Sequence, residues 1–344
     1  MQIQKTQLAS LPWIYAVSAF LIGGQQFFLA ASELEGEGGS CLLIDPVSGR
    51  IETLWNAPGG VMSLVPVPEE EGTFLSIEEF YPVFKSERAA IYKTSVHLTE
   101  KGWEIHKREI CRLPFAHRIT LLQEPDGSYL AAANLCRSKK FVEDWSDPGG
   151  IYIGAYSGGT VTLEQILGGL SKNHGMYTQT TPAGDVLWIG AHEGLVRCWR
   201  EDGQWKTAFV LREEISDICI ADIDGDGEDE LAVIEGFHGD KASVLKWCGS
   251  QYEKLATLPL QFGHVVWAGR LLGQSFLITS SRAGEMELAA HRAVSGPEGL
   301  FFETTVLDQG TGATQIAVVE KENAAWVFAA DHETGSADLY TLRL

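Results

Sequence analysis

Residues 27–33 read FFLAASE, an apolar run that ends in small residues and one polar side chain. The same pattern returns six more times, at intervals of roughly 45–55 residues. The seven copies are FFLAASE (27–33), TFLSIEE (73–79), YLAAAN (129–134), LWIGAH (187–192), VIEGFH (233–238), FLITSSR (276–282) and WVFAADH (326–332). Dividing the 344 residues by seven gives about 49, which is near the length of a four-stranded propeller blade.

Each copy occupies the second place in a repeat of four short strands. A first apolar strand precedes it, and a third strand and a fourth, charged and aromatic strand follow it. Alternating hydropathy, frequent glycine and scarce helical periodicity predict an all-β fold, a seven-bladed β-propeller of four-stranded blades. Residues 162–172, TLEQILGGLSK, are the exception, and their pattern predicts a short helical insertion.

The two ends of the chain predict how the ring closes. The last repeat begins near Thr311 and supplies only three strands before the chain ends. Residues 1–9, MQIQKTQLA, are similar to the fourth strands of other repeats. We therefore expect the N-terminal strand to complete the last blade, which removes exposed sheet edges and makes residues 1–344 a single β-propeller domain.

Composition excludes several classes of function. A hydrophobic content of 45% is enough for a large core, whereas a net charge of −20 argues against a nucleic-acid partner. No apolar run reaches about 18 residues, so a membrane partner is not expected. Pro12 and Tyr15 interrupt the early apolar segment, which predicts a cytoplasmic chain without a leader. The six cysteines lie singly and are expected to be reduced core thiols.

Residues 222–231, DIDGDGEDEL, lie between the expected first and second strands of the fifth repeat, at the bottom of the propeller. This stretch resembles the calcium loop of FG-GAP or VCBS repeats, which occur in integrin-type propellers. The resemblance implies structural calcium held by Asp222, Asp224, Asp226, the carbonyl of Glu228, and Glu230. Glu230 departs from the family pattern, which usually has Asp there. The alternative is a solvated acidic turn without an ion.

Histidines gather at the opposite, top face. His117, His174 and His264 fall where first strands begin, and His192, His238 and His332 fall where second strands end. Both positions lie near the axis on one face, so these imidazoles are expected to converge there. His97, His106 and His291 lie on outer strands, and no chemistry is assigned to them.

Clustered neutral imidazoles form either a metal site or a proton-transfer set. Neighbouring repeats predict His174, His192, His238 and His264 as ligands of zinc, manganese or iron, with Asp217 as an oxygen ligand or an orienting group. A metal-free polar pocket and a chance gathering remain as alternatives.

Other polar side chains are expected around this centre. Arg282 is the candidate substrate anchor, because a guanidinium can hold a carboxylate with two parallel hydrogen bonds. Its alternative is an ion pair with Glu33 or Glu285. Tyr177, Glu79 and Asn134 are expected nearby, and Tyr177 is a candidate catalytic residue. The long loops 79–90 and 134–150 carry basic residues and Trp145, which could stack on a sugar ring or simply be solvated.

The segments GFHGD (236–240) and FGHVVWAG (262–269) resemble the propeller domains of aldos-2-ulose dehydratases and, more loosely, propeller-fold polysaccharide lyases. The resemblance implies a metal-dependent lyase or dehydratase that acts on a sugar or uronic acid in the central pocket of the top face. A histidine outside the metal's ligands, His117 or His332, would remove a proton, and Arg282 would hold the substrate.

A second class of function is kept open, because a fold does not settle a function. The chain could be a non-catalytic propeller that binds a glycan or a protein on its top face, with the calcium site purely structural. An inactive relative of an enzyme is a third possibility.

Overall fold

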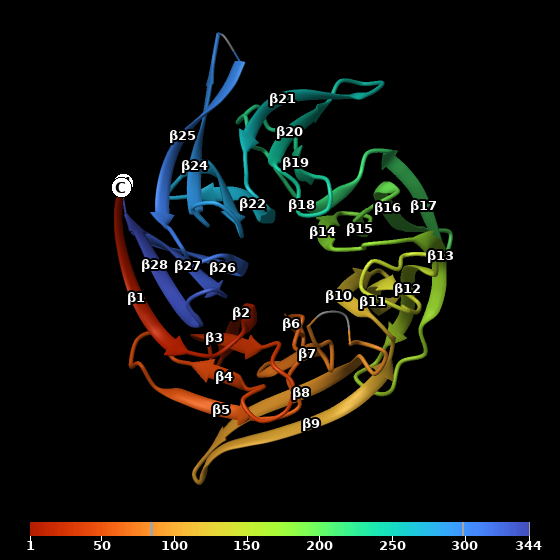
Figure 1. The fold of residues 1–344 in the computed structure, drawn as a ribbon, viewed down its shortest axis with the longest axis vertical. Coiled ribbons are helices and arrows are strands. Elements are labelled where there is room, and N and C mark those ends of the chain that lie inside the picture. Colours follow the sequence, from red (N-terminus) through yellow and green to blue (C-terminus); the bar gives the residue numbers. More distant parts are fainter. Residues whose placement is uncertain (83–84, 298, 344) are drawn as a thin grey trace.

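The computed structural model describes residues 1–82, 85–297 and 299–343. Its strands form seven four-stranded antiparallel sheets arranged in a ring, which confirms the predicted seven-bladed β-propeller (Figure 1). In each blade the first strand lies nearest the axis and the fourth lies at the rim (Figure 1).

The first four blades follow the chain in simple order. Blade 1 holds β2 (Ile14–Ile22), β3 (Gln25–Ser32), β4 (Cys41–Ile44) and β5 (Ile51–Trp55). Blade 2 holds β6 (Ser63–Pro66), β7 (Thr73–Glu78), β8 (Ala90–Thr99) and β9 (Gly102–Arg112). Blade 3 holds β10 (Ala116–Glu124), β11 (Gly127–Cys136), β12 (Pro148–Tyr156) and β13 (Glu164–Leu170). Blade 4 holds β14 (Gly175–Thr181), β15 (Gly184–Ala191), β16 (Gly194–Glu201) and β17 (Gln204–Leu211).

The last three blades include the one that closes the ring. Blade 5 holds β18 (Ile215–Ala221), β19 (Glu230–Glu235), β20 (Lys241–Trp247) and β21 (Tyr252–Pro259). Blade 6 holds β22 (Gly263–Leu271), β23 (Gln274–Ser281), β24 (Leu288–Gly296) and β25 (Gly299–Asp308). Blade 7 holds β26 (Ala313–Lys321), β27 (Ala324–Asp331), β28 (Ser336–Arg343) and, from the N-terminus, β1 (Gln2–Ser10).

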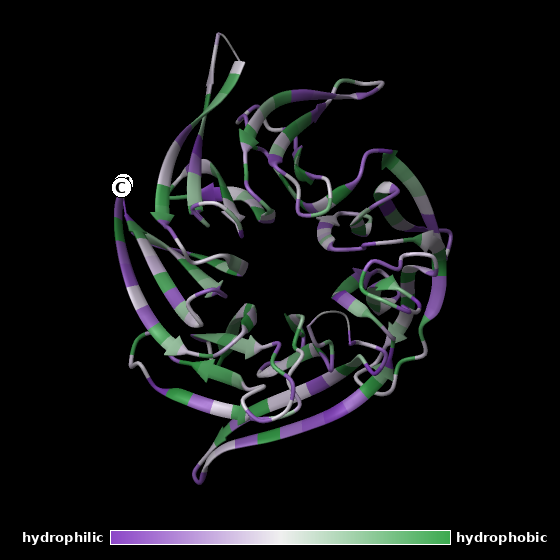
Figure 2. Ribbon diagram, viewed as in Figure 1, coloured by the Kyte–Doolittle hydropathy of each residue, from purple (hydrophilic) through white to green (hydrophobic). Residues whose placement is uncertain are grey.

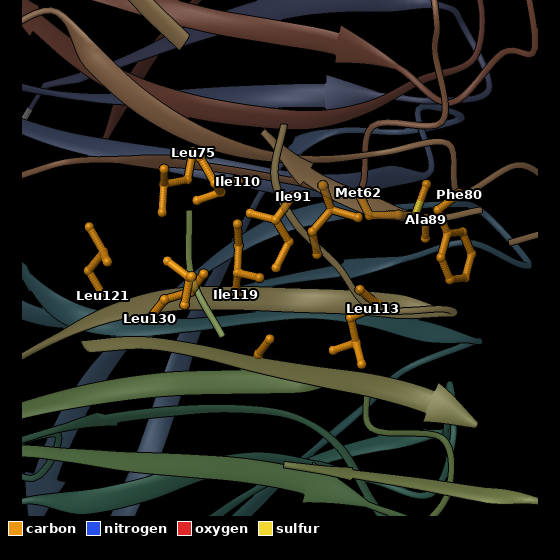
Figure 3. Packing of buried hydrophobic residues seen from close by; sticks show 14 of the residues in the cluster. Met62, Leu75, Phe80, Ala89, Ile91, Ile110, Leu113, Ile119, Leu121 and Leu130 are labelled. Carbon is orange, nitrogen blue, oxygen red and sulfur yellow. The ribbon is translucent and has the colours of Figure 1, made fainter. Parts of the chain in front are cut away.

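The core lies between neighbouring sheets. One cluster of buried residues joins blades 2 and 3, where Ile91 and Ile110 face Ile119 and Leu130 (Figure 3). Along the long rim strands, hydrophilic and hydrophobic residues follow one another (Figure 2), as expected for sheets with one buried and one wetter face. Burial of apolar area between the blades therefore stabilises the ring.

The predicted helix at 162–172 is wrong. Residues 164–170 form β13, which pairs with β12 and completes blade 3. The leucines in this segment have a helical spacing although it forms a strand. The pairing of β13 with β12 is irregular, with two shifts of register, so strict alternation is not maintained. Tertiary pairing therefore overrides the local pattern. Among the described residues no helix is long and apolar enough to cross a membrane.

A buried polar network fastens the closing blade. Lys5 on β1 contacts Asp308 at 2.5 Å and the buried Asp338 at 2.8 Å. The Tyr340 hydroxyl lies 2.7 Å from Asp331 Oδ2 and 2.9 Å from Asp308 Oδ2. One hydroxyl has one proton to donate, so one of these two carboxyls must carry a proton of its own. Burial, together with the neighbouring Asp338, raises the pKa of Asp331 to about 8, which assigns the proton to Asp331.

This protonated carboxyl predicts a pH-dependent stability. Native Asp331 holds a proton that the unfolded chain, with an ordinary aspartate pKa of 3.8, releases above about pH 4. Its contribution to the free energy of unfolding is therefore present at low pH and is lost as pH rises towards 8, by up to about 1.4 kcal/mol per pH unit. Melting temperatures at pH 6 and pH 8.5 should differ less in Asp331→Asn than in the wild type. Equal differences in both proteins would contradict the assignment.

Candidate functional site

The top face is the end of the ring at which first strands begin and second strands end. There, the pairing of first and second strands skips one residue in four blades and two in the seventh. The skipped residues are Tyr15, His117, Ser216, His264, and Thr314 with Gln315. Such β-bulges re-aim a side chain and release backbone groups from the ladder. Two of the histidines on the top face, His117 and His264, are bulge residues of this kind.

Three of the predicted metal ligands meet at this mouth. His174, His238 and His264 each offer a ring nitrogen within 4.8 Å of the others. The Nε2 atoms of His174 and His238 lie 3.3 Å apart. His174 and His264 are buried, and His238 is partly exposed on the loop after β19. The predicted convergence therefore holds for these three histidines.

The two buried imidazoles are held in one orientation by backbone carbonyls. His174 Nδ1 lies 3.0 Å from the carbonyl oxygen of Ser216, and His264 Nδ1 lies 2.9 Å from that of Thr314. Both acceptors are bulge residues. Each Nδ1 must therefore carry the proton, which leaves the Nε2 lone pair facing the cluster, as in metal-binding histidines.

A close backbone approach makes the first of these bonds possible. Gly175 follows His174, and a Cβ atom at this glycine would lie 2.6 Å from Asp217 Cα and 2.8 Å from the Ser216 carbonyl oxygen. Because glycine lacks that atom, the start of β14 can lie directly against β18.

Burial keeps the cluster neutral. It lowers the pKa values of His174 and His264 well below the ordinary value, and neighbouring imidazoles and Arg118 lower them further. Burial also lowers the pKa of His238 to about 3, with Arg282 adding to the shift. Neutral imidazole is the form that binds a metal ion, so no proton has to leave before a metal enters at pH 7.

His117 lies beside these three histidines. Its ring centroid is 4.7 Å from that of His174, and its Nε2 is 3.3 Å from the Tyr15 hydroxyl. Its Nδ1 is buried and has no hydrogen-bond partner among the described residues. Burial lowers the pKa of His117 well below its ordinary value, and Arg118 contributes. The side chain is thus a neutral base candidate adjacent to the predicted metal position.

A channel of about 280 Å³ runs down from the cluster and is lined by Arg118, Asp217, Tyr177 and Gln315, among others. Asp217 accepts the Val266 N–H at 2.9 Å, and burial raises its pKa to about 6. The Tyr177 hydroxyl donates to the Ile220 carbonyl at 2.9 Å, and burial raises its pKa. Among the described residues, the group of converging ring nitrogens does not include Asp217, which lines the channel together with Tyr177.

His192 does not join the cluster. Its side chain is about half exposed, and Nδ1 contacts Glu214 Oε1 at 2.8 Å. Glu214 also accepts a hydrogen bond from Lys172 at 3.0 Å. The strand end that carries His192 lies on the top face as predicted, but its side chain points to this carboxylate instead of the axis.

Arg282 and His332 form a second polar group on the top face. Arg282 Nη2 donates to His332 Nδ1 at 2.9 Å and to Glu333 Oε1 at 3.1 Å. His332 Nε2 then lies 2.9 Å from Glu33 Oε1. The predicted ion-pair alternatives for Arg282 named Glu33 and Glu285, whereas the structure pairs it with Glu333. Both ring nitrogens of His332 are engaged, which leaves His117 as the less constrained base candidate.

Several polar residues of the two long loops make contacts within those loops. Glu79 pairs with Arg88 at 2.5 Å, and the Asn134 amide donates to the Cys136 carbonyl at 2.8 Å. Lys139 Nζ lies 3.3 Å from the ring centroid of Trp145. The Trp145 ring face that a sugar would need is therefore shared with a lysine.

The acidic loop lies at the opposite end of blade 5, between β18 and β19, as predicted. Asp222, Asp224 and Asp226 bring carboxylate oxygens within 4.8 Å of one another. Lys246 on β20 reaches into this group, and its Nζ lies 2.6 Å from Asp224, 2.6 Å from Asp226 and 2.8 Å from Glu230.

These contacts bear on the predicted calcium site. Partial burial lowers the pKa of Lys246, but hydrogen bonds to the three carboxylates outweigh it and raise the pKa above its ordinary value. The lysine is therefore a cation supplied by the chain itself, and calcium would have to displace it. Glu228 contributes its backbone N–H to Asp226. The predicted calcium site stays a prediction, and this arrangement favours the ammonium group in its place.

Replacing Lys246 by Met is expected to leave the buried Glu230 and its two aspartates without a cation. We expect a loss of about 2–3 kcal/mol in the free energy of unfolding, below the 3–5 kcal/mol of a fully buried pair because Asp226 is half exposed. Millimolar Ca²⁺ should restore part of it, measured by urea unfolding. Lys241→Met, on the same strand with an exposed ion pair, is the matched control. A wild-type melting temperature that drops by several degrees in chelator would instead establish calcium as the resident cation.

Sequence reasoning missed Arg118, Tyr15 and Lys246. Arg118 directly follows His117 in the sequence. Leu245 pairs with Leu231, which brings the next residue on β20, Lys246, close to Glu230. Strand pairing predicted from the repeat could have placed Lys246 beside the acidic loop. No local signal marks Tyr15, which reaches His117 across the mouth from blade 1.

Comparison with known proteins shows the fold alone. No protein-family model matches the chain, and no curated protein matches it. A chain of a mitotic checkpoint complex is similar with a TM-score of 0.62 and 12% identity, over 99% of this chain and 93% of its own. A candidate 6-phosphogluconolactonase from Bacteroides uniformis is similar with a TM-score of 0.54 and 11% identity, over 93% and 89%.

Proposed function

We propose that this propeller binds one divalent transition metal (zinc, manganese or iron) through His174, His238 and His264. The observation that carries the proposal is the fixed orientation of His174 and His264, whose Nδ1–H groups are bonded to bulge carbonyls. Three neutral nitrogen ligands leave a further coordination position, which is the arrangement of catalytic metal sites. A bound metal would supply a Lewis acid that polarises a carbonyl or carboxylate oxygen of a substrate.

We further propose that the site acts as a lyase or dehydratase on a sugar or uronic acid. His117 is the base: with its Nε2–H on the Tyr15 oxygen, its free Nδ1 accepts the proton from the carbon next to the substrate carbonyl or carboxylate. The electron pair of that C–H bond forms a C=C bond as the C–O bond on the neighbouring carbon breaks. The departing oxygen takes the electron pair of the C–O bond and the proton now held by His117, which returns the base to its neutral form. Arg282, held by Glu333 and His332, would bind the substrate carboxylate at the rim of the mouth.

A binding function without catalysis is the second candidate. It is favoured by the engagement of Tyr177, His332 and Arg282, three of the four predicted catalytic side chains, in hydrogen bonds within the protein. On this proposal the top face binds a glycan or protein through the same polar groups.

Elemental analysis of untagged protein purified without added metal tests the proposal. We expect near one equivalent of zinc, manganese or iron per chain, and an ultraviolet-absorbing unsaturated product from some member of a panel of uronic and keto sugars. Metal without any product would support the binding function. Less than a tenth of an equivalent, with no uptake of added Zn²⁺ or Co²⁺, would overturn the metal site.

A further inference from the structure

A second candidate site lies between the outer strands of blades 4 and 5 and shares no residue with the three-histidine cluster. A groove of about 860 Å³ lies between blades 4 and 5. Its walls come from the end of β17, around Phe209 and Arg212, and from the hairpin between β20 and β21, around Trp247 and Tyr252. Trp188 and Arg197 complete one side. Its volume falls in the usual range for ligand sites.

The groove combines aromatic surface with cations. Trp247 is about half exposed and packs against Tyr252, with ring centroids 5.2 Å apart. The Arg197 guanidinium lies 5.9 Å from the Trp188 ring and 5.2 Å from the Trp199 ring, and that of Arg212 lies 3.8 Å from the Phe209 ring. Aromatic residues and arginine are the side chains enriched at binding hot spots.

Among the described residues, six of the chain's thirteen arginines form ion pairs with carboxylates, and these two do not. Arg88, Arg112, Arg137, Arg200, Arg282 and Arg292 all pair with carboxylates. Arg197 and Arg212 have no carboxylate partner among the described residues, although the chain carries a net charge of −20. Glu213 also lines the groove, and its Oε2 accepts the backbone N–H of Arg212 at 3.1 Å. The guanidinium groups of Arg197 and Arg212, which lie near aromatic rings, are thus available to a carboxylate of another molecule.

The β17 wall of the groove also offers backbone groups that can form hydrogen bonds. β17 is the outermost strand of its sheet, and in the described parts of the chain it pairs only with β16. Its last residues, Phe209 to Leu211, line the groove, and the ladder with β16 skips Val210 there. This edge therefore carries a β-bulge, which leaves backbone N–H and C=O groups outside the ladder. An extended peptide can use such an edge, whereas a small rigid anion cannot.

We propose that this groove, formed by Arg197, Phe209, Arg212, Trp247 and Tyr252, binds an extended acidic peptide of a partner protein. The peptide adds a short strand to the edge of β17. Its carboxylates bind Arg197 and Arg212, and an aromatic or large aliphatic side chain packs on Trp247 and Phe209. The site is independent of the proposed metal centre, because it lies on outer strands of blades 4 and 5 and shares no residue with the channel.

The test is selection of random seven-residue peptides displayed on phage against the full chain. We expect enriched peptides that contain acidic residues beside an aromatic or large aliphatic one. As synthetic fluorescent peptides, they should bind Arg197→Ala and Trp247→Ala at least tenfold more weakly than the wild type, while Arg197→Lys loses less. Arg292→Ala, which removes an arginine from the rim of another blade, is the matched control and should bind normally.

Circular dichroism melts establish that each variant is folded, and both side chains are exposed enough to be replaced without loss of core. Enriched peptides without acidic residues, or equal binding to wild type and Arg197→Ala, would overturn the proposal. So would a selection that yields no peptide confined to this groove. Binding of free succinate with the same affinity as the peptides would show a small-anion site instead.

Discussion

Replacing His174 or His264 by alanine is expected to weaken Zn²⁺ binding by more than about a hundredfold. Changes to groups that only orient a metal ligand cost about 10- to 100-fold, and each of these histidines is proposed as a ligand itself. Each is also buried, with its other nitrogen held by a backbone carbonyl, so its loss leaves a gap in a site whose remaining imidazoles are fixed in place. The measurement is a competition titration of Zn²⁺ against a chromophoric chelator.

The histidine series contains its own controls. His238→Ala should have a smaller effect, because this side chain is partly exposed and water can take its coordination position. His106→Ala removes an exposed histidine paired with Glu104 on the rim and should bind Zn²⁺ like the wild type. Unchanged affinity in both His174→Ala and His264→Ala, in proteins that melt cooperatively, would show that zinc binds elsewhere.

Gly239→Ala is expected to damage the same site without touching a proposed ligand. A Cβ atom at this position would lie 1.7 Å from the carbonyl oxygen of Glu235, so the backbone of the loop would have to move. The loop carries His238, whose φ of 53° is already in the left-handed region. The Gly239 carbonyl also accepts the N–H of Gly263, next to His264, at 2.8 Å. One added methyl group therefore displaces two of the three imidazoles.

We expect at least tenfold weaker Zn²⁺ binding by Gly239→Ala, with its far-ultraviolet circular dichroism spectrum unchanged. Gly159→Ala is the matched control, because a Cβ atom there meets no atom within 4 Å and the glycine has an ordinary φ. Zinc affinity equal to that of the wild type would show that the loop is not needed to place His238. Global unfolding would instead make the glycine a requirement of the fold.

The architecture could be predicted from the sequence because its signals are local and repeat seven times. Apolar runs such as residues 27–33 and 326–332 alternate with turns at a spacing that a four-stranded blade requires. Residues 1–9 are similar to a fourth strand, and β1 indeed pairs with β28. The same repeat placed six histidines on one face, since strand direction alone decides which end of a strand lies there.

Only the tertiary structure decided which of these side chains meet. His174, His238 and His264 converge, whereas His192 contacts Glu214 and His332 contacts Glu33. The direction of a side chain depends on β-bulges and on loop residues with positive φ, and the alternating pattern of a strand predicts neither. Lys246 meets the acidic loop only after β19 and β20 pair. Local patterns in this chain thus determine the strands and the face on which they end, while packing between blades determines the direction of each polar side chain near the axis.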